Sequence, residues 1–167
     1  MQSYIKKSLC PLVLLFILAL TMPANAKTEK IEKTFSVNKG GALVIECSQG
    51  SIDVGSWNED EVSVSVIKRG LNLKDLKSYK VQIEQKGNDI YIKGVERQHN
   101  NIEVVFTVDV PRGYNVTLKT DEGYINVNDI KGNVDAYTSK GNIKVADVDG
   151  SLKADALGGK IHLENSL

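Results

Sequence analysis

Apolar residues return at fixed places in the last third of the chain, residues 116–167, with a period of nine. Divided at that period, the segment reads VTLKTDEGY, INVNDIKGN, VDAYTSKGN, IKVADVDGS, LKADALGGK and IHLENSL. The first position is always Val, Ile or Leu, and each complete unit has glycine at its eighth position. The alternation predicts short strands. Glycine after each strand predicts a corner at which the backbone passes through positive φ.

The fifth position shows that the true repeat is longer. Alternate units place there either a small residue (Thr120, Thr138, Ala156) or an acidic or amide residue (Asp129, Asp147, Asn165). The repeat is therefore eighteen residues long and has two unlike corners. A fixed period near twenty indicates stacked units whose apolar faces are buried only by their neighbours. The pattern predicts a flattened β-solenoid in which each rung rises about 4.8 Å.

This register defines three inward columns of apolar side chains. They are Val116, Val134 and Leu152; Ile125, Ile143 and Ile161; and Val127, Val145 and Leu163. An antiparallel β-sandwich or meander is the alternative architecture, because nine residues also make one strand and one hairpin turn. Corners that alternate in chemistry favour the solenoid, since a meander has no need of them.

An earlier segment, residues 43–54, follows the same rule. It aligns with the first repeat so that Leu43, Ile45 and Cys47 take the places of Val116, Leu118 and Thr120. Cys47 is the only cysteine after residue 26. Its place in an inward column predicts a buried thiol rather than an intermolecular disulfide.

The residues between these segments predict an antiparallel strand section. Phe35 and Val37 alternate with polar residues, and Val62, Val64 and Val66 do so again. Further strands are expected at Val81–Glu84, Asp89–Lys93 and Ile102–Val110, with one or two helical turns or a loop within Gly70–Tyr79. Pro111 ends the section, because proline removes a donor from the strand ladder.

The first residues have the pattern of an export signal. Lys6 and Lys7 precede the apolar run Leu9–Met22, and Ala24-Asn25-Ala26 supplies the small residues of a cleavage site. The run is shorter than the about 20 residues that a membrane-spanning helix needs. We therefore expect a signal peptide over 1–26, a disordered lead over 27–33, and a single domain over 34–167 with no stable transmembrane helix.

Charge argues against nucleic acid as a partner. The chain has 21 basic and 21 acidic residues, and loss of 1–26 leaves 19 basic and 21 acidic residues, a net charge of −2. No basic stripe is present along the sequence.

The segments GGALVIECSQGSIDVGSW, VDVPRGYNVTLKTDEGYINV, KGNIKV and GGKIHL resemble the bacterial adhesin-like β-strand-repeat family, which is related to the "head GIN" adhesin domain. The resemblance covers nearly all of the chain after the signal. It implies an exported envelope protein with a right-handed β-solenoid body, and it brings no catalytic residues. The chain departs from the family at Leu167, where the third eighteen-residue rung is cut short.

Candidate chemistry is sparse. His99 and His162 have no partner at zinc-ligand spacing, and the corner residues Asp129 and Asp147 supply too few of the six to eight ligands of Ca²⁺. No nucleophile elbow or phosphate-binding loop occurs. We expect no enzymatic activity, no cofactor and no metal.

The aromatic residues expected to be exposed give little indication of a sugar-binding site. Tyr124 and Tyr137 are expected to point outward from different columns, which disfavours a single aromatic platform for a polysaccharide. Trp57 occupies a corner position and is expected to pack rather than bind.

The sequence therefore predicts an exported, non-enzymatic envelope protein, in the periplasm or on the cell surface, that acts as a scaffold or adhesive surface. The alternative is an assembly or regulatory module that binds a protein, an envelope component or a second copy. It would act through an uncapped strand edge formed by Ile161, Leu163 and Leu167, because solenoids need capping repeats and open edges recruit partners.

Overall fold

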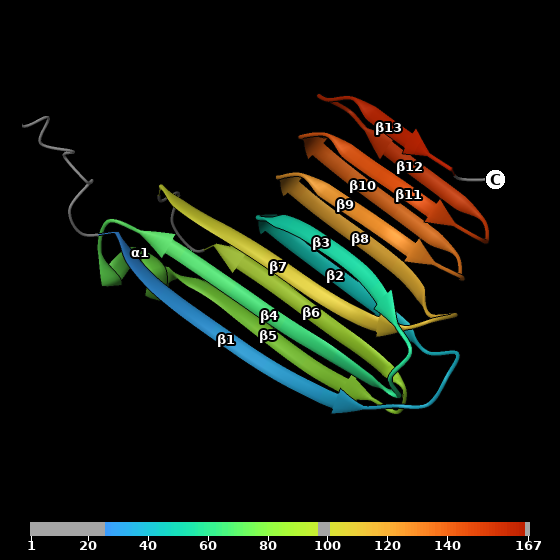
Figure 1. Ribbon diagram of the computed structural model, residues 1–167. Coiled ribbons are helices and arrows are strands. Elements are labelled where there is room, and N and C mark those ends of the chain that lie inside the picture. Colours follow the sequence, from blue (N-terminus) through green and yellow to red (C-terminus); the bar gives the residue numbers. More distant parts are fainter. Residues whose placement is uncertain (1–25, 97–100, 166–167) are drawn as a thin grey trace, which may run out of the picture.

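Two mixed β-sheets lie face to face in the computed structural model, which describes residues 26–96 and 101–165 (Figure 1). The first sheet contains, in spatial order, β1 (Lys27–Ser36), β4 (Glu61–Gly70), β7 (Ile102–Pro111), β3 (Ser51–Trp57), β9 (Ile125–Ile130), β11 (Ile143–Val148) and β13 (Ile161–Glu164). The second contains β12 (Leu152–Ala156), β10 (Val134–Lys140), β8 (Asn115–Glu122), β2 (Ala42–Gln49), β6 (Asp89–Glu96) and β5 (Tyr79–Lys86). The expected all-β class is confirmed, and the two facing sheets fit the sandwich alternative.

In the last third of the chain, successive strands alternate between the two sheets. Val134 pairs with Val116 on one side and Leu152 on the other, and Ile143 pairs with Ile125 and Ile161 in the same way. All four pairings are parallel. The eighteen-residue register predicted from the sequence is therefore confirmed. We call the six strands β8 to β13 the ladder.

The earlier rung, β2 with β3, is stacked directly on the ladder. Its residues pair with β8 as predicted, in the register Leu43 to Val116, Ile45 to Leu118 and Cys47 to Thr120. On its other side β2 pairs with β6, and β3 pairs with β7. The chain that leaves β7 must therefore pass this rung before it starts β8, so the β2–β3 rung occupies the middle of both sheets.

The remaining strands form the predicted antiparallel section. β1 pairs with β4, β4 with β7, and β5 with β6, all antiparallel. A short helix, α1 (Leu73–Ser78), follows β4, so of the two alternatives left open for Gly70–Tyr79, helix or loop, the helix is correct. Asn72 caps this helix by accepting a hydrogen bond from the backbone N of Asp75.

The expectation of a disordered lead over 27–33 is wrong, because these residues belong to β1. That strand pairs with β4 along its whole length, from Lys27 opposite Gly70 to Ser36 opposite Glu61. Ile31 and Phe35 pack on the core, while most of the charged side chains are exposed. A charged strand of this kind is typical of a sheet edge, where charges discourage pairing with other chains.

Close stacking of successive corners explains why glycine recurs in the ladder. A Cβ atom on Gly123 would lie 2.0 Å from the carbonyl oxygen of Gly50, and one on Gly141 would lie 2.0 Å from that of Gly123. Gly132 and Gly150 meet the preceding corner in the same way, although neither has positive φ. The expectation that every corner glycine serves positive φ is therefore corrected.

Left-handed backbone occurs at the fifth position of alternate nine-residue units, where the sequence has Asp or Asn. Asp129, Asp147 and Asn165 have φ of 55°, 53° and 48°. Asp and Asn tolerate this region better than other side chains, because they hydrogen-bond locally. Their conspicuous column is thus accounted for by turn geometry.

Candidate functional site

The predicted interaction edge lies at the end of the ladder, on β13. Ile161 is 43% exposed and Leu163 is 53% exposed, whereas Ile143 and Val145 in the same columns are 0% exposed. The difference arises because no rung covers β13 on its outer side in the described residues. Leu167, the third predicted residue, lies outside the described residues.

The open edge extends to β12 in the facing sheet. Leu152, Ala154 and Ala156 are only partly buried there, and Leu157 is 68% exposed. Figure 1 shows β12 and β13 together at one end of the molecule. We call this surface the apolar end.

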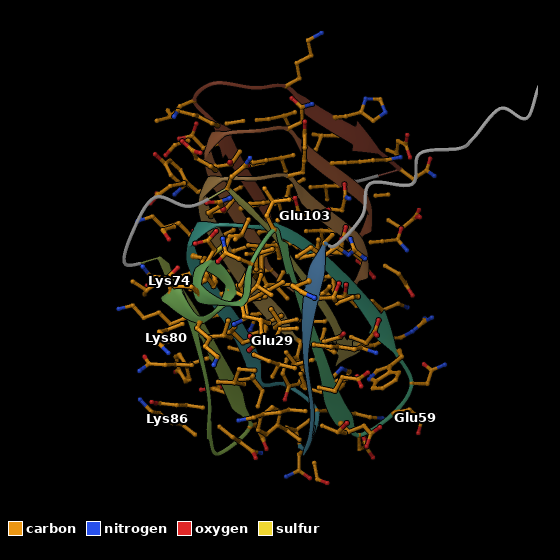
Figure 2. All side chains as sticks on the ribbon, turned by 90° about the vertical axis from the view of Figure 1, so that its left-hand side faces the viewer. Glu29, Glu59, Lys74, Lys80, Lys86 and Glu103 are labelled. Atoms are coloured by element: carbon orange, nitrogen blue, oxygen red, sulfur yellow. The ribbon has the colours of Figure 1, made fainter. Side chains whose placement is uncertain are left out.

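The opposite end of the second sheet is protected by charge. Figure 2 shows Lys80 and Lys86 of β5 projecting from the molecule, with Glu59 of the β3–β4 connection on the other side. Lys86 also forms an ion pair with Glu84, at 3.7 Å. Edge lysines oppose strand pairing, so the two ends of the molecule differ in their capacity to accept a partner.

A second surface feature lies on the outer face of the first sheet. Its outward side chains stand in two neighbouring rows across β3, β9, β11 and β13, as the strand register requires. One row stands at the first residue of β3 and at the residues just before β9, β11 and β13: Ser51, Tyr124, Asn142 and Lys160. The other row lies within the four strands: Asp53, Asn126, Lys144 and His162. These residues line a depression of about 470 Å³. We call it the outer-face groove.

Several polar groups in the outer-face groove are held in place by hydrogen bonds. Asn126 donates from Nδ2 to Asp53 Oδ1 at 2.7 Å. Asn142 accepts at Oδ1 from the backbone N of Lys160 at 2.9 Å. Both bonds link adjacent rungs, so the amide groups repeat with the spacing of the strands.

Charge is unevenly distributed along the outer-face groove. Lys144 lies 3.2 Å from Glu164 at one rim, and His162 lies 2.9 Å from the same carboxylate. Hydrogen bonds from His162 and then Lys144 lower the pKa of Glu164. Among the described residues, Lys160 forms no ion pair within 4.0 Å. The groove thus has an acidic side chain, Asp53, near one end and an uncompensated lysine near the other.

The structure separates the two tyrosines that the sequence marks as outward. Tyr124 immediately precedes β9 of the first sheet and is 56% exposed, whereas Tyr137 lies on β10 of the second sheet. Lys119 stands over the Tyr137 ring at 5.7 Å. They do not form a common platform, in agreement with their prediction in different columns.

Other residues considered from the sequence serve the fold. Cys47 is buried, as expected, and burial raises the pKa of its thiol to about 11. Trp57 is half-buried at a corner, where its Nε1 donates to the backbone oxygen of Glu61. The Asp129 carboxylate is paired with Arg112 at 3.0 Å. His99 and the expected signal residues 1–25 lie outside the described residues.

Within the described part of the chain, no helix has both the length and the apolar character that crossing a membrane demands. In the same residues, no three side chains of His, Cys, Asp or Glu gather as metal ligands would.

The outer-face groove was not predicted, although part of its signal is in the sequence. Tyr124, Asn142 and Lys160 stand eighteen residues apart, as do Asn126, Lys144 and His162. The eighteen-residue repeat therefore predicts three of the four residues in each row. The fourth rung, with Ser51 and Asp53, depends on the insertion of β2 and β3 beside the ladder.

No family model and no curated protein matches the chain. Among solved structures, a proposed cell adhesion protein from Clostridium sporogenes is 9% identical, with a TM-score of 0.48 over 83% of this chain and 99% of that chain. A proposed adhesin from Parabacteroides distasonis is 17% identical, with a TM-score of 0.35 over 80% and 67%. One from Bacteroides fragilis is 11% identical, with a TM-score of 0.31 over 81% and 97%. Similarity at this level assigns neither a family nor a function.

Proposed function

We propose that the protein is an exported, non-enzymatic component of the cell envelope whose ladder is a rigid scaffold for a binding surface. The right-handed β-solenoid expected from the sequence is proposed for the ladder as well, and its parallel eighteen-residue register supports that description. Export is supported by the sequence of residues 1–26.

The observation that carries the proposal is the outer-face groove. Paired strands in one register carry one of its rows, and the other row stands at the corners where the chain enters those strands, joined rung to rung by backbone hydrogen bonds. A surface built on paired strands holds its side chains more rigidly than loops do. The groove volume of about 470 Å³ lies within the range of about 300–1,000 Å³ that is usual for ligand sites.

Export is tested by expressing the full chain with a carboxy-terminal tag in a bacterium. We expect the recovered protein to begin at Lys27, measured by intact mass, and to leave the cells when the outer membrane is opened. A protein that keeps residues 1–26 and stays with the cytoplasm contradicts this part of the proposal.

Binding is tested by sedimenting the purified protein with isolated bacterial envelopes. We expect the protein to pellet, and we expect Asn126→Ala combined with Lys144→Ala to weaken pelleting. The control is Lys119→Ala combined with Asp135→Ala on the outer face of the second sheet. Equal pelleting of the two double variants contradicts the assignment of the surface to the outer-face groove.

The second proposed function is assembly through the apolar end. The first two rungs of the ladder are each covered by a following rung of the same pattern, so the occupant that best fits Ile161 and Leu163 is a further rung of this kind. We assign that role to a second copy of the chain, which supplies its own apolar end. Two such ends can pair about a two-fold axis, which is the commonest symmetry of protein dimers.

Light scattering on the purified protein tests this assembly. We expect a dimer that dissociates when Leu163→Lys places a charge in the apolar end, whereas Leu71→Lys, another exposed leucine, leaves it intact. A monomer at tens of micromolar, or a dimer insensitive to Leu163→Lys, contradicts the proposal.

A further inference from the structure

We propose that the outer-face groove binds an extended saccharide that carries carboxylates, such as a chain of uronic acids. This inference rests on the proposed binding function and names the chemical class of its ligand. Three properties of the groove support it: an exposed aromatic ring, repeated polar groups, and the ammonium of Lys160, which forms no ion pair among the described residues.

The aromatic ring is that of Tyr124, which is 56% exposed. An isolated exposed tyrosine needs no functional explanation. Tyr124, however, shares the outer face with Asn142 beside it in the same row and Asn126 in the next row. The face of an aromatic ring carries partial negative charge, so it attracts the weakly positive C–H bonds on the face of a sugar ring.

The polar groups are of the types that bind sugar hydroxyls. Asn126 and Asn142 each have two N–H donors and an acceptor oxygen, and the carboxylate of Asp53 accepts only. The bond between Asn126 and Asp53 at 2.7 Å fixes the orientation of both before a ligand arrives. Neighbouring rungs are about 4.8 Å apart, close to the length of one sugar ring in an extended chain. Successive rungs can therefore meet successive sugar units.

Charge selects an acidic saccharide over a neutral one. The groove is lined by two lysines, Lys144 and Lys160, and by one carboxylate, that of Asp53. Lys144 is already paired with Glu164 at 3.2 Å. Lys160 forms no ion pair among the described residues, so its ammonium is available to a carboxylate of the ligand. A charge-assisted bond to an ammonium is stronger than a hydrogen bond between neutral groups.

Nuclear magnetic resonance titration of the full protein tests the inference with three probes: hexasaccharides of galacturonate, of mannuronate, and of neutral glucose in β-1,4 linkage. We expect at least one uronate to shift the amide signals of β3, β9, β11 and β13 and to bind more tightly than the neutral probe. Tyr124→Ala should weaken that binding at least tenfold, about 1.4 kcal/mol. Lys160→Gln should abolish the preference for the uronate.

The matched control is Tyr137→Ala, which removes a tyrosine that also neighbours a lysine, but on the opposite sheet. It should leave uronate binding unchanged. The inference is overturned if neither uronate binds at millimolar concentration, if Tyr124→Ala binds as well as the wild type, or if the neutral probe binds equally. If the protein pellets with envelopes but binds no uronate, only the choice of ligand is overturned. If it neither pellets with envelopes nor binds a uronate, the proposed binding function is overturned as well.

Discussion

The side chains of Cys47 and Thr120 both point at the carbonyl oxygen of Gly50. Thr120 donates from Oγ1 at 3.0 Å, and the Cys47 sulfur lies 3.9 Å from the same oxygen. One rung further along, Thr138 donates from Oγ1 to the carbonyl oxygen of Gly123 at 3.1 Å. The two threonines of this inward column therefore tie β8 and β10 to a corner glycine of the rung below each of them. Thr120 and Thr138 thus contribute a hydrogen bond as well as a small side chain.

Replacement of Thr120 by Val keeps the shape of the side chain and removes its hydrogen bond to Gly50. Thr120 is 0% exposed, so the lost bond is not replaced by water. We expect Thr120→Val to lower the free energy of unfolding by about 1–3 kcal/mol, measured by urea denaturation. Thr117→Val, at an exposed position of the same strand, should change it by less than about 0.5 kcal/mol. Equal stability of the two variants would refute the role of the column.

The thiol of Cys47 should be unreactive in the folded protein. Burial raises its pKa from 9.0 to about 11, and the thiolate is the reactive form. We expect a disulfide reagent at pH 8 to label Cys47 fully in urea and only slowly without it. Rapid labelling of the native protein at pH 8 would contradict the buried position.

The same shift makes the folded state sensitive to alkali. The folded protein holds the thiol proton up to a pH of about 11, whereas the unfolded chain loses it near 9. Stability from this group is therefore complete below pH 9 and is lost as the pH rises toward 11, by up to about 1.4 kcal/mol per pH unit. Burial, with a contribution from Asp89, raises the pKa of Tyr114 to about 12 and extends the loss in the same direction. Urea titrations of wild type and Cys47→Ala between pH 8 and 11 should show a shallower decline in the variant, and parallel curves would exclude the thiol as a cause.

Close stacking of the corners makes Gly123 irreplaceable. A Cβ atom there would lie 2.0 Å from the oxygen of Gly50, and the rungs would have to separate. We expect Gly123→Ala to cost more than about 3 kcal/mol of unfolding free energy, in the range of severe core substitutions. Gly87, with φ of 63° and nothing within 4 Å of its missing Cβ, is the control. Gly87→Ala should cost only the backbone penalty of about 1 kcal/mol.

The ladder was predictable because its pairing register follows from the repeat in the sequence. Each inward position, such as Val134, is repeated eighteen residues away at Val116 and Leu152, so the sequence itself states the register. The order of the upstream rungs was not predictable. The alignment of Leu43 and Ile45 with the first repeat indicated the pairing of β2 with β8, but nothing in their pattern says that β6 lies on the other side of β2.

The first part of β1, residues 27–33, escaped prediction for a related reason. An edge strand buries little, so its sequence has too few apolar residues to show a period, and its partners on β4 lie at least twenty-five residues away. The outer-face groove likewise depends on pairing between segments that are far apart in the sequence. Asp53 meets Asn126 only because the β2–β3 rung is placed beside the ladder.

Lys68 joins three elements of the antiparallel section from a buried position. It is 3% exposed, and its Nζ donates to the carbonyl oxygens of Leu76 and Tyr79 at 2.9 and 3.2 Å. It also lies 2.9 Å from the carboxylate of Glu29 on β1. Charge and hydrogen bonds thus hold β1 and the end of α1 against β4.

Replacement of Lys68 by Met fills similar space but leaves these three acceptors without their donor. We expect Lys68→Met to destabilise the protein by about 3 kcal/mol, because removal of one partner from a buried ion pair costs about 3–5 kcal/mol and Glu29, which is partly exposed, regains some solvation. Hydrogen exchange should accelerate first in β1 and α1, while the ladder stays protected. Lys80→Met, at an exposed position of β5, is the control and should leave exchange unchanged. Uniform acceleration across both sheets would show instead that β1 and α1 unfold only together with the ladder.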